Sequence, residues 1–250
     1  SLSIGASGST FKDDRAASGS KGGSVVRDLE IGIRLSQRFS LSPGISFGNS
    51  DRDDDSGGGS DTKSTTGQIG FFWGPFRTPY AWFDGNVSHT SSEIATDAVG
   101  SAGQLLKNIE YDSKSTGVGI GINGVKQLGQ KIQLEGRFGW SAAFSNREAY
   151  EDSANITHLE TDTTIHRFSL GCRLVKPMNW GQFSLSSSVK YVGSDNSSAD
   201  QDDKPFDANL GLGISYNITD NFSLSSSIGC ILGRQDYQEY NGSLNLKINF

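Results

Sequence analysis

The sequence has little of several residue types that helical and disulfide-rich proteins use. Its 250 residues include one methionine, five prolines, two cysteines and three histidines, beside 32 glycines. This composition argues against a helical protein, because glycine weakens a helix. No apolar run approaches the roughly 20 residues that a membrane-spanning helix needs. We therefore expect neither a helical bundle nor a transmembrane helix.

The charges and the cysteines exclude further classes. The net charge is -6, and no basic stripe is present, so nucleic acid is not an expected partner. Cys172 and Cys230 fall on the apolar side of strands that should lie three apart, too far for a disulfide, and we expect free thiols. No signal peptide is recognisable before the first strand pattern at Ser1. We expect a mature chain whose targeting segment has been removed.

What the sequence does contain is strict alternation, clearest in its last eleven residues, YNGSLNLKINF. One face of this segment carries Tyr240, Leu244, Leu246, Ile248 and Phe250, and the other carries only polar residues. A period of two predicts a β-strand and excludes a helix. The segment also ends on an exposed aromatic residue, and a soluble protein rarely leaves such an edge unpaired.

The same alternation recurs along the whole chain, in about twelve segments. Short turns are expected near residues 37, 76, 129, 179 and 220, and they alternate with longer polar loops near 18, 57, 100, 154, 199 and 236. The loops are expected to span about 12–24, 51–64, 90–110 and 146–162. Residues 1–250 are therefore predicted to form one all-β domain, an antiparallel up-and-down barrel of about twelve strands with both termini on the short-turn side.

The terminal strand, the final phenylalanine and the alternation of turns and loops resemble bacterial outer-membrane β-barrel proteins. In size and strand number the chain is similar to small porins and to autotransporter translocator barrels. The resemblance implies an integral outer-membrane protein with periplasmic termini, surrounded by lipid and lipopolysaccharide. It also implies that the barrel assembly machinery reads the terminal strand, with Tyr240, Leu244, Leu246, Ile248 and Phe250 as the signal. No cofactor is expected.

Inward positions of the expected strands are mostly glycine, serine and asparagine, which predicts an open, wet lumen. Ten charged residues fall on this inner face and are the pore-lining candidates: Asp28, Glu30, Arg34, Asp84, Glu135, Arg137, Arg167, Arg173, Lys190 and Lys247. Such charges can set ion preference in a pore. They can equally form ion pairs between strands that hold the barrel together, and the sequence leaves both roles open.

Two other sequence patterns are weak indications of a catalytic or a metal-binding site. His89 and Ser91 alternate at the outer end of a strand, where a rim lipid hydrolase would place a base and a nucleophile. No residue that would orient the histidine is identifiable, so we expect no enzyme. Asp51, Asp53 and Asp55 resemble the start of a calcium loop, but Ser56 replaces the required glycine and no glutamate closes it. No metal site is predicted beyond this weak calcium candidate.

The sequence favours a passive, porin-like channel for small hydrophilic solutes. One alternative is an autotransporter-type translocator barrel that lacks its helix and passenger. Another is a structural or partner-binding envelope barrel that works through its loops. The narrow lumen of a twelve-stranded barrel weakens the channel hypothesis, because a loop could close it.

Overall fold

The computed structural model describes residues 1–13, 19–55, 57–74, 81–99, 105–129, 131–152, 155–194, 206–232 and 237–250. No helix long and apolar enough to cross a membrane occurs among them. The strands are β1 (Leu2–Asp13), β2 (Ser20–Ile31), β3 (Ile33–Arg34), β4 (Phe39–Asp54), β5 (Gly59–Trp73), β6 (Ala81–Val99), β7 (Leu105–Gln127), β8 (Gln133–Arg147), β9 (Tyr150–Glu151), β10 (Thr157–His158), β11 (Thr161–Met178), β12 (Gly181–Ser194), β13 (Phe206–Thr219), β14 (Phe222–Leu232) and β15 (Tyr237–Ile248).

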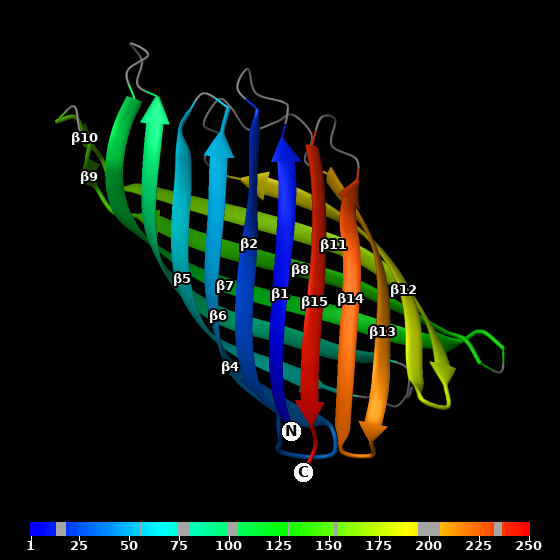
Figure 1. The fold of residues 1–250 in the computed structure, drawn as a ribbon. Coiled ribbons are helices and arrows are strands. Elements are labelled where there is room, and N and C mark those ends of the chain that lie inside the picture. The colour runs from blue at the N-terminus through cyan, green and yellow to red at the C-terminus, as the bar shows by residue number, and fades with distance from the viewer. Residues whose placement is uncertain are drawn as a thin grey trace.

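These strands close into a twelve-stranded antiparallel barrel, as the alternation predicts. Each strand pairs with its neighbours in sequence, and β1 pairs with β15 to complete the ring (Figure 1). The short β3 continues the line of β2, and both pair with β4. Only β9 and β10, among the described strands, lie outside the wall, as a small hairpin between β8 and β11.

The strand registers fix the width of the barrel. Followed once around the ring, they accumulate a stagger of about 14 residues, which corresponds to a tilt of about 40°. Twelve strands at this tilt enclose a cylinder roughly 23 Å across between backbone atoms. Small inward side chains therefore leave an unfilled lumen, whereas large ones would close it.

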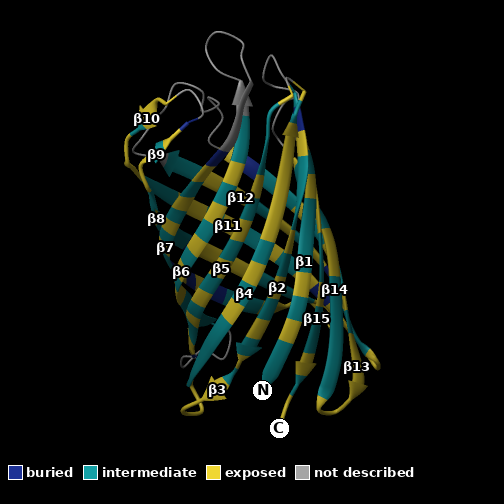
Figure 2. Cartoon of the chain, turned by 60° about the vertical axis from the view of Figure 1, so that its left-hand side comes forward, coloured by how far each residue is buried: buried dark blue, intermediate teal, exposed yellow. Residues whose placement is uncertain are grey.

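The barrel is apolar on its outside, unlike a water-soluble protein. Ile109, Ala142 and Val175 are the buried hydrophobic residues among those described, whereas forty-one large hydrophobic residues are exposed. Figure 2 shows how exposed and intermediate positions alternate along each strand. On β13, for example, the outward side chains run from Phe206 to Tyr216, with small-to-large apolar residues between them. Such a surface is stable only against a lipid phase.

Aromatic pairs mark both edges of this apolar belt. Trp180 and Tyr216 pair near the short turns, with ring centroids 5.9 Å apart, and Tyr191 and Phe206 pair towards the opposite end at 5.2 Å. Tyr216 and Phe206 lie about ten residues apart on one strand, the length that a tilted strand needs to span a bilayer. These pairs correspond to the interfacial girdles of membrane barrels.

The two ends of the barrel differ. The termini and the short turns at 35–38, 179–180 and 220–221 share one end with the end of β7 and the start of β8; it is here called the turn end (Figure 1). The opposite end, where β1 ends and β2 begins, is called the loop end. Gly129 has a φ of 75°, which the tight turn between β7 and β8 requires and which glycine adopts freely. The expected turn near 76 and the expected loops near 18, 100, 199 and 236 lie wholly or partly outside the described residues.

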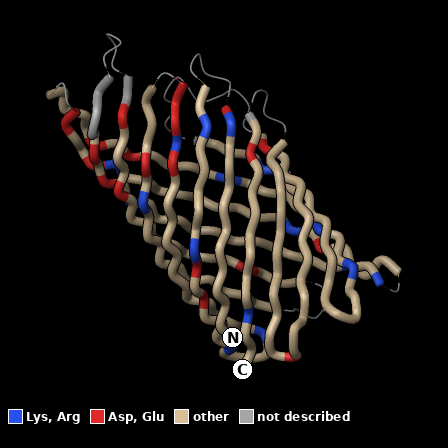
Figure 3. Tube along the Cα trace, in the orientation of Figure 1, with Lys and Arg blue, Asp and Glu red and all other residues tan. Residues whose placement is uncertain are grey.

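The expected loop boundaries were wrong at the loop end, where the strands extend further. Residues 51–54 and 59–64 belong to β4 and β5, and Asp51 faces Asp61 in the ladder. Likewise β6 reaches Val99 and β7 begins at Leu105. Outside the membrane both faces of a strand meet water, so hydrophobic alternation disappears while the backbone hydrogen bonds continue. Acidic residues gather on these extensions (Figure 3).

Candidate functional site

The candidate site is the lumen of the barrel, because the inward side chains are too small to fill it. A cavity of about 730 Å³ opens against the inner faces of β6–β8 and β11–β15. Serine, glycine and asparagine dominate its lining, as expected from the sequence. Of the ten charged candidates, four line this cavity: Glu135, Arg137, Arg173 and Lys247.

One charged cluster spans three strands near the turn end. Arg137 on β8 donates a hydrogen bond from Nη2 to Oδ1 of Asp84 on β6, at 2.5 Å. Asn123 on β7 donates from Nδ2 to the other carboxylate oxygen, at 2.5 Å. Asn123 is buried, whereas Arg137 keeps half of its side chain exposed to the lumen. Asp84 is therefore held on both oxygens, and Arg137 still presents charge to the pore.

A second ion pair lies beside the first. Arg173 on β11 places Nη1 3.5 Å from Oε2 of Glu135 on β8, and the two residues are direct cross-strand partners. Its Nη2 donates to Oγ of Ser184 on β12, at 3.2 Å. Both ion pairs lie on the inner side of the strands from β6 to β12, and we call this part of the lumen the charged wall.

The opposite inner wall, from β12 to β15 and β1, is a hydroxyl wall with few charges. Ser227 and Ser243 share a hydrogen bond of 2.7 Å between their Oγ atoms, and Ser3 donates to Oδ1 of Asn245 at 3.0 Å. Among the ten charged candidates, Lys247 lies on β15 in this wall and is exposed, and Lys190 lies on β12 nearer the loop end. The lumen thus has one face of paired charges and one of neutral hydrogen-bonding groups, a surface that water and polar solutes can wet.

The remaining charged candidates lie away from this cluster. Asp28 faces Gly5 and Asn245 on the inner side, since a Cβ at Gly5 would meet its carboxylate. Glu30 is opposite Ser3. Arg34 lies in β3 near the turn end and is exposed. Arg167 and Lys190 lie on the neighbouring strands β11 and β12 towards the loop end, and Lys190 is opposite the buried Asp207.

Sequence reasoning missed an inward aromatic pair beside the charged wall. Trp82 lines the lumen cavity and contacts Phe72, with ring centroids 6.1 Å apart. Trp82 is two residues before the inward Asp84, so the parity of the strand could have identified it.

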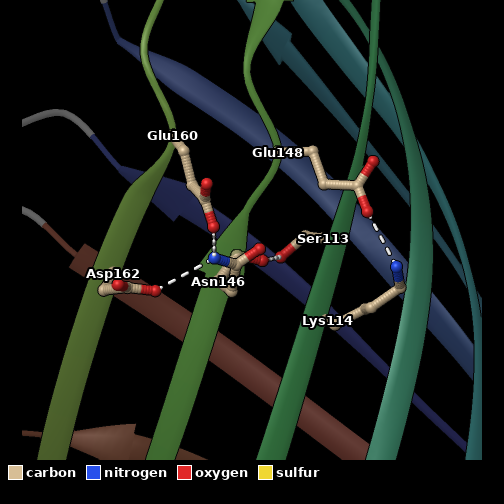
Figure 4. A network of polar contacts seen from close by, with 6 residues as sticks. All are labelled: Ser113, Lys114, Asn146, Glu148, Glu160 and Asp162. Atoms are coloured by element: carbon tan, nitrogen blue, oxygen red, sulfur yellow. Dashed lines mark hydrogen bonds and ion pairs between the residues drawn. The ribbon is translucent and has the colours of Figure 1, made fainter.

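A polar network reinforces the loop end of the wall, beyond the apolar belt. Figure 4 shows Asn146 between Glu160 and Asp162, and Lys114 reaching Glu148. Nδ2 of Asn146 donates to both carboxylates, 3.0 Å from Asp162 Oδ1, and Lys114 Nζ lies 2.7 Å from Glu148 Oε1. The hydrogen bond and charge of Glu148 raise the pKa of Lys114 above its ordinary value.

The β9–β10 hairpin is joined to this region by stacked rings. Tyr150 stacks on Tyr111 at 4.8 Å and on His158 at 4.5 Å between centroids. Nε2 of His158 lies 2.9 Å from Oδ2 of the buried Asp152, and the guanidinium of Arg147 lies over both tyrosine rings. Burial raises the pKa of Tyr111, while the nearby positive charge of Arg147 lowers it and Tyr150 raises it.

The two weak chemical patterns lie on the outer surface. Nδ1 of His89 is 3.1 Å from Oγ1 of Thr116 on β7, so the ring is hydrogen-bonded to a threonine of the next strand. Asp51 and Asp53 lie in strand β4 rather than in a calcium-type loop, and Asp55 follows directly. No group of three potential metal ligands occurs within the described part of the chain.

The cysteines and the terminal strand are as expected. Cys172 and Cys230 are free thiols on β11 and β14, which confirms the absence of a disulfide between them. In β15, Tyr240, Leu244, Leu246 and Ile248 occupy alternate ladder positions, and Phe250 follows with 92% of its surface exposed. Whether the assembly machinery reads these residues stays a prediction.

An apolar exterior with aromatic girdles, a wet lumen and a closed ring define a transmembrane β-barrel. The chain belongs to the outer membrane protein beta-barrel domain family, whose profile matches residues 83–250. This family places the protein in the outer membrane. No curated protein matches the sequence.

Solved structures show the same fold at low sequence identity. The translocator domain of autotransporter NalP from Neisseria meningitidis superposes with a TM-score of 0.84 and 12% identity, over 100% of this chain and 88% of that one. The beta domain of the Bordetella autotransporter BrkA superposes with a TM-score of 0.71 and 11% identity. The match covers 100% of this chain and 98% of that one. An outer membrane channel from Pseudomonas putida F1 superposes with a TM-score of 0.61 and 14% identity. The match covers 100% of this chain and 95% of that one. The chain is thus similar to both translocator barrels and channels.

Proposed function

We propose that the protein is a passive channel for small hydrophilic solutes. The observation that carries this proposal is the lumen, in which a hydroxyl wall faces a charged wall across a cavity of about 730 Å³. Every described strand except β9 and β10 belongs to the barrel wall. Small polar side chains leave a path that water can fill, and the paired charges tune which ions follow it.

The channel is oriented with its turn end in the periplasm and its loop end outside the cell. Short turns on the periplasmic side and longer connections outside are the rule for bacterial outer-membrane barrels. The acidic strand extensions then project among the lipopolysaccharide headgroups. In this orientation the terminal strand ends in the periplasm, where the assembly machinery would meet it.

Single-channel conductance of the refolded protein in a planar bilayer tests the proposal. Stable ohmic steps are expected, and Ser225→Phe should reduce them because Ser225 lines the lumen cavity. Ser226→Phe is the matched control. Ser226 also borders the cavity, but it is opposite the outward Leu244, so its side chain faces lipid, whereas Ser225 is opposite the inward Asn245. A folded protein without conductance, or equal conductance in both variants, would exclude the channel.

A second candidate, a translocator barrel, is favoured by the likeness to the NalP translocator domain. The same lumen would then hold an extended or helical segment of a secreted passenger. An in-frame passenger sequence upstream of this chain in its gene, together with surface display of that passenger, would support it. We propose no catalytic activity, because the candidate base His89 is hydrogen-bonded to Thr116 rather than to Ser91.

A further inference from the structure

The outer surface carries two adjoining grooves beside the seam of β1 and β2. The lower groove, of about 560 Å³, is almost entirely apolar and crosses β4, β2, β1, β15 and β14. It is hollow because Ala6 is small, whereas the surrounding Leu29, Ile45, Leu244 and Leu246 are large. An acyl chain fits the chemistry of this groove.

The upper groove lies nearer the loop end and is polar. It has a volume of about 760 Å³ and includes two basic residues, Arg27 and Lys63. Five acidic residues line it as well: Asp51, Asp61, Glu93, Glu110 and Asp112. Arg27 and Phe47 line both grooves, so the apolar and polar surfaces are continuous at this point. A ligand that occupies both must be amphipathic, with its polar group towards the loop end.

Arg27 is unusual for a residue in this position. Its neighbours on the outer face are Val25 and Leu29 along β2, and Ala6 and Phe47 across the ladder. Its side chain is exposed, and within the described residues it forms neither an ion pair nor a hydrogen bond. A cation surrounded by lipid-facing apolar residues is costly unless a counter-charge accompanies it, so such residues mark binding sites.

The carboxylates of the upper groove also need a positive counter-charge. Asp51 and Asp61 are direct cross-strand partners on the outer face, where two like charges repel. A magnesium ion commonly binds one or two carboxylates together with phosphate oxygens of a ligand. A phosphate in this groove can therefore contact Arg27 and Lys63 directly and share a divalent ion with Asp51 and Asp61.

We propose that the two grooves form a binding site for a phosphorylated glycolipid of the lipid A type. One acyl chain lies along the apolar groove, and a sugar phosphate lies against Arg27 and Lys63, with a divalent ion between phosphate and carboxylates. The choice of lipid A over an ordinary phospholipid rests on the place of the polar groove at the loop end, which the proposed function assigns to the outer leaflet.

Native mass spectrometry of the refolded protein, titrated with bisphosphorylated lipid A in magnesium, tests the site. Arg27→Gln and Lys63→Gln should each weaken binding at least about tenfold, the usual effect of losing a hydrogen bond between charged groups. Arg27→Lys should restore part of it. Lys114→Gln is the matched control, because Lys114 is exposed at the same end but lies outside both grooves. Heat-dependent mobility in gels verifies that each variant is folded.

Three further measurements separate this site from general lipid contact. Removal of the phosphates from lipid A, or chelation of magnesium, should weaken binding to the wild type and abolish the difference between wild type and Arg27→Gln. Phosphatidylglycerol should bind at least about tenfold more weakly. Equal binding of both lipids, or equal binding by Arg27→Gln and Lys114→Gln, would overturn the proposal. Unchanged conductance of Arg27→Gln would show that the site and the channel are independent.

Discussion

Arg137 and Asp84 form an ion pair although the strands that carry them are not neighbours. Strand β7 lies between them, and the pair passes over Gly121 of that strand. A Cβ at Gly121 would lie 2.7 Å from Nη2 of Arg137 and 2.8 Å from Oδ1 of Asp84. The absence of a side chain at one residue thus allows a charge pair to form across the inner surface.

The first prediction concerns ion preference. Arg137→Gln leaves the negative charge of Asp84 without its partner, so the lumen should shift towards cations, whereas Asp84→Asn should shift it towards anions. Reversal potentials in a salt gradient measure both shifts. The double variant should return close to the wild type, because it restores neutrality. Since Arg137 is half exposed, each single change should lower the free energy of unfolding by only about 0–1 kcal/mol.

The second prediction concerns Gly121 itself. Gly121→Ala should displace Arg137 from Asp84, because the new methyl group occupies the space that the pair needs. Ion preference should then change in the folded barrel, since the displaced groups are the ends of flexible side chains. Gly136→Ala serves as the control, because nothing lies within 4 Å of the added Cβ there. Identical reversal potentials for the two variants would show that the pair does not shape the pore.

The third prediction separates folding from assembly. Phe250 is 92% exposed and follows the last residue of β15, so Phe250→Ser should change the free energy of unfolding in micelles by less than about 0.5 kcal/mol. Assembly in cells should fall clearly if the machinery reads this residue. Quantifying folded barrel in isolated outer membranes gives the measurement, with Asn249→Ser as the control. Wild-type levels of folded Phe250→Ser would remove this residue from the signal.

The fourth prediction concerns Tyr111 at the loop end. Burial raises the pKa of Tyr111 above its ordinary value of 10.0, and Arg147 opposes that rise. The stabilising contribution of the neutral ring is therefore complete below pH 10 and is lost as the pH rises through the raised pKa. Arg147→Gln should raise the pKa further. Tyrosinate absorbance, with Tyr111→Phe subtracted, follows this titration, and a lower pKa in Arg147→Gln would contradict it.

Much of the fold could be predicted from the alternation of apolar and polar residues. This alternation arises because one face of the barrel wall contacts lipid and the other faces the wet lumen. The segment from Phe206 to Tyr216 alternates as sharply as the terminal strand, and both lie in the apolar belt. The polar extensions of the strands at the loop end were missed, because these segments do not contact lipid and therefore need no apolar residues at alternate positions.

The candidate site was less accessible to prediction. Parity places Asp84, Glu135, Arg137 and Arg173 on the inner face, but it does not say which of them meet. Their pairing depends on the relative register of three or more strands and on the missing side chain at Gly121. The sequence of one strand does not determine that register by itself, because the register also depends on the turns and on closure of the whole ring.

The pairing of β1 with β15 also determines how the molecule can be made. It joins Leu2 to Ile248 and Asp13 to Tyr237, so nearly the whole chain lies between the two partners. Contacts of such high sequence separation form slowly, because the intervening loop must be closed first. Until the last strand arrives, every intermediate has two open edges that can pair with another chain. Closure should therefore be the slow step of folding, and a copy that lacks either strand should aggregate rather than form a smaller barrel.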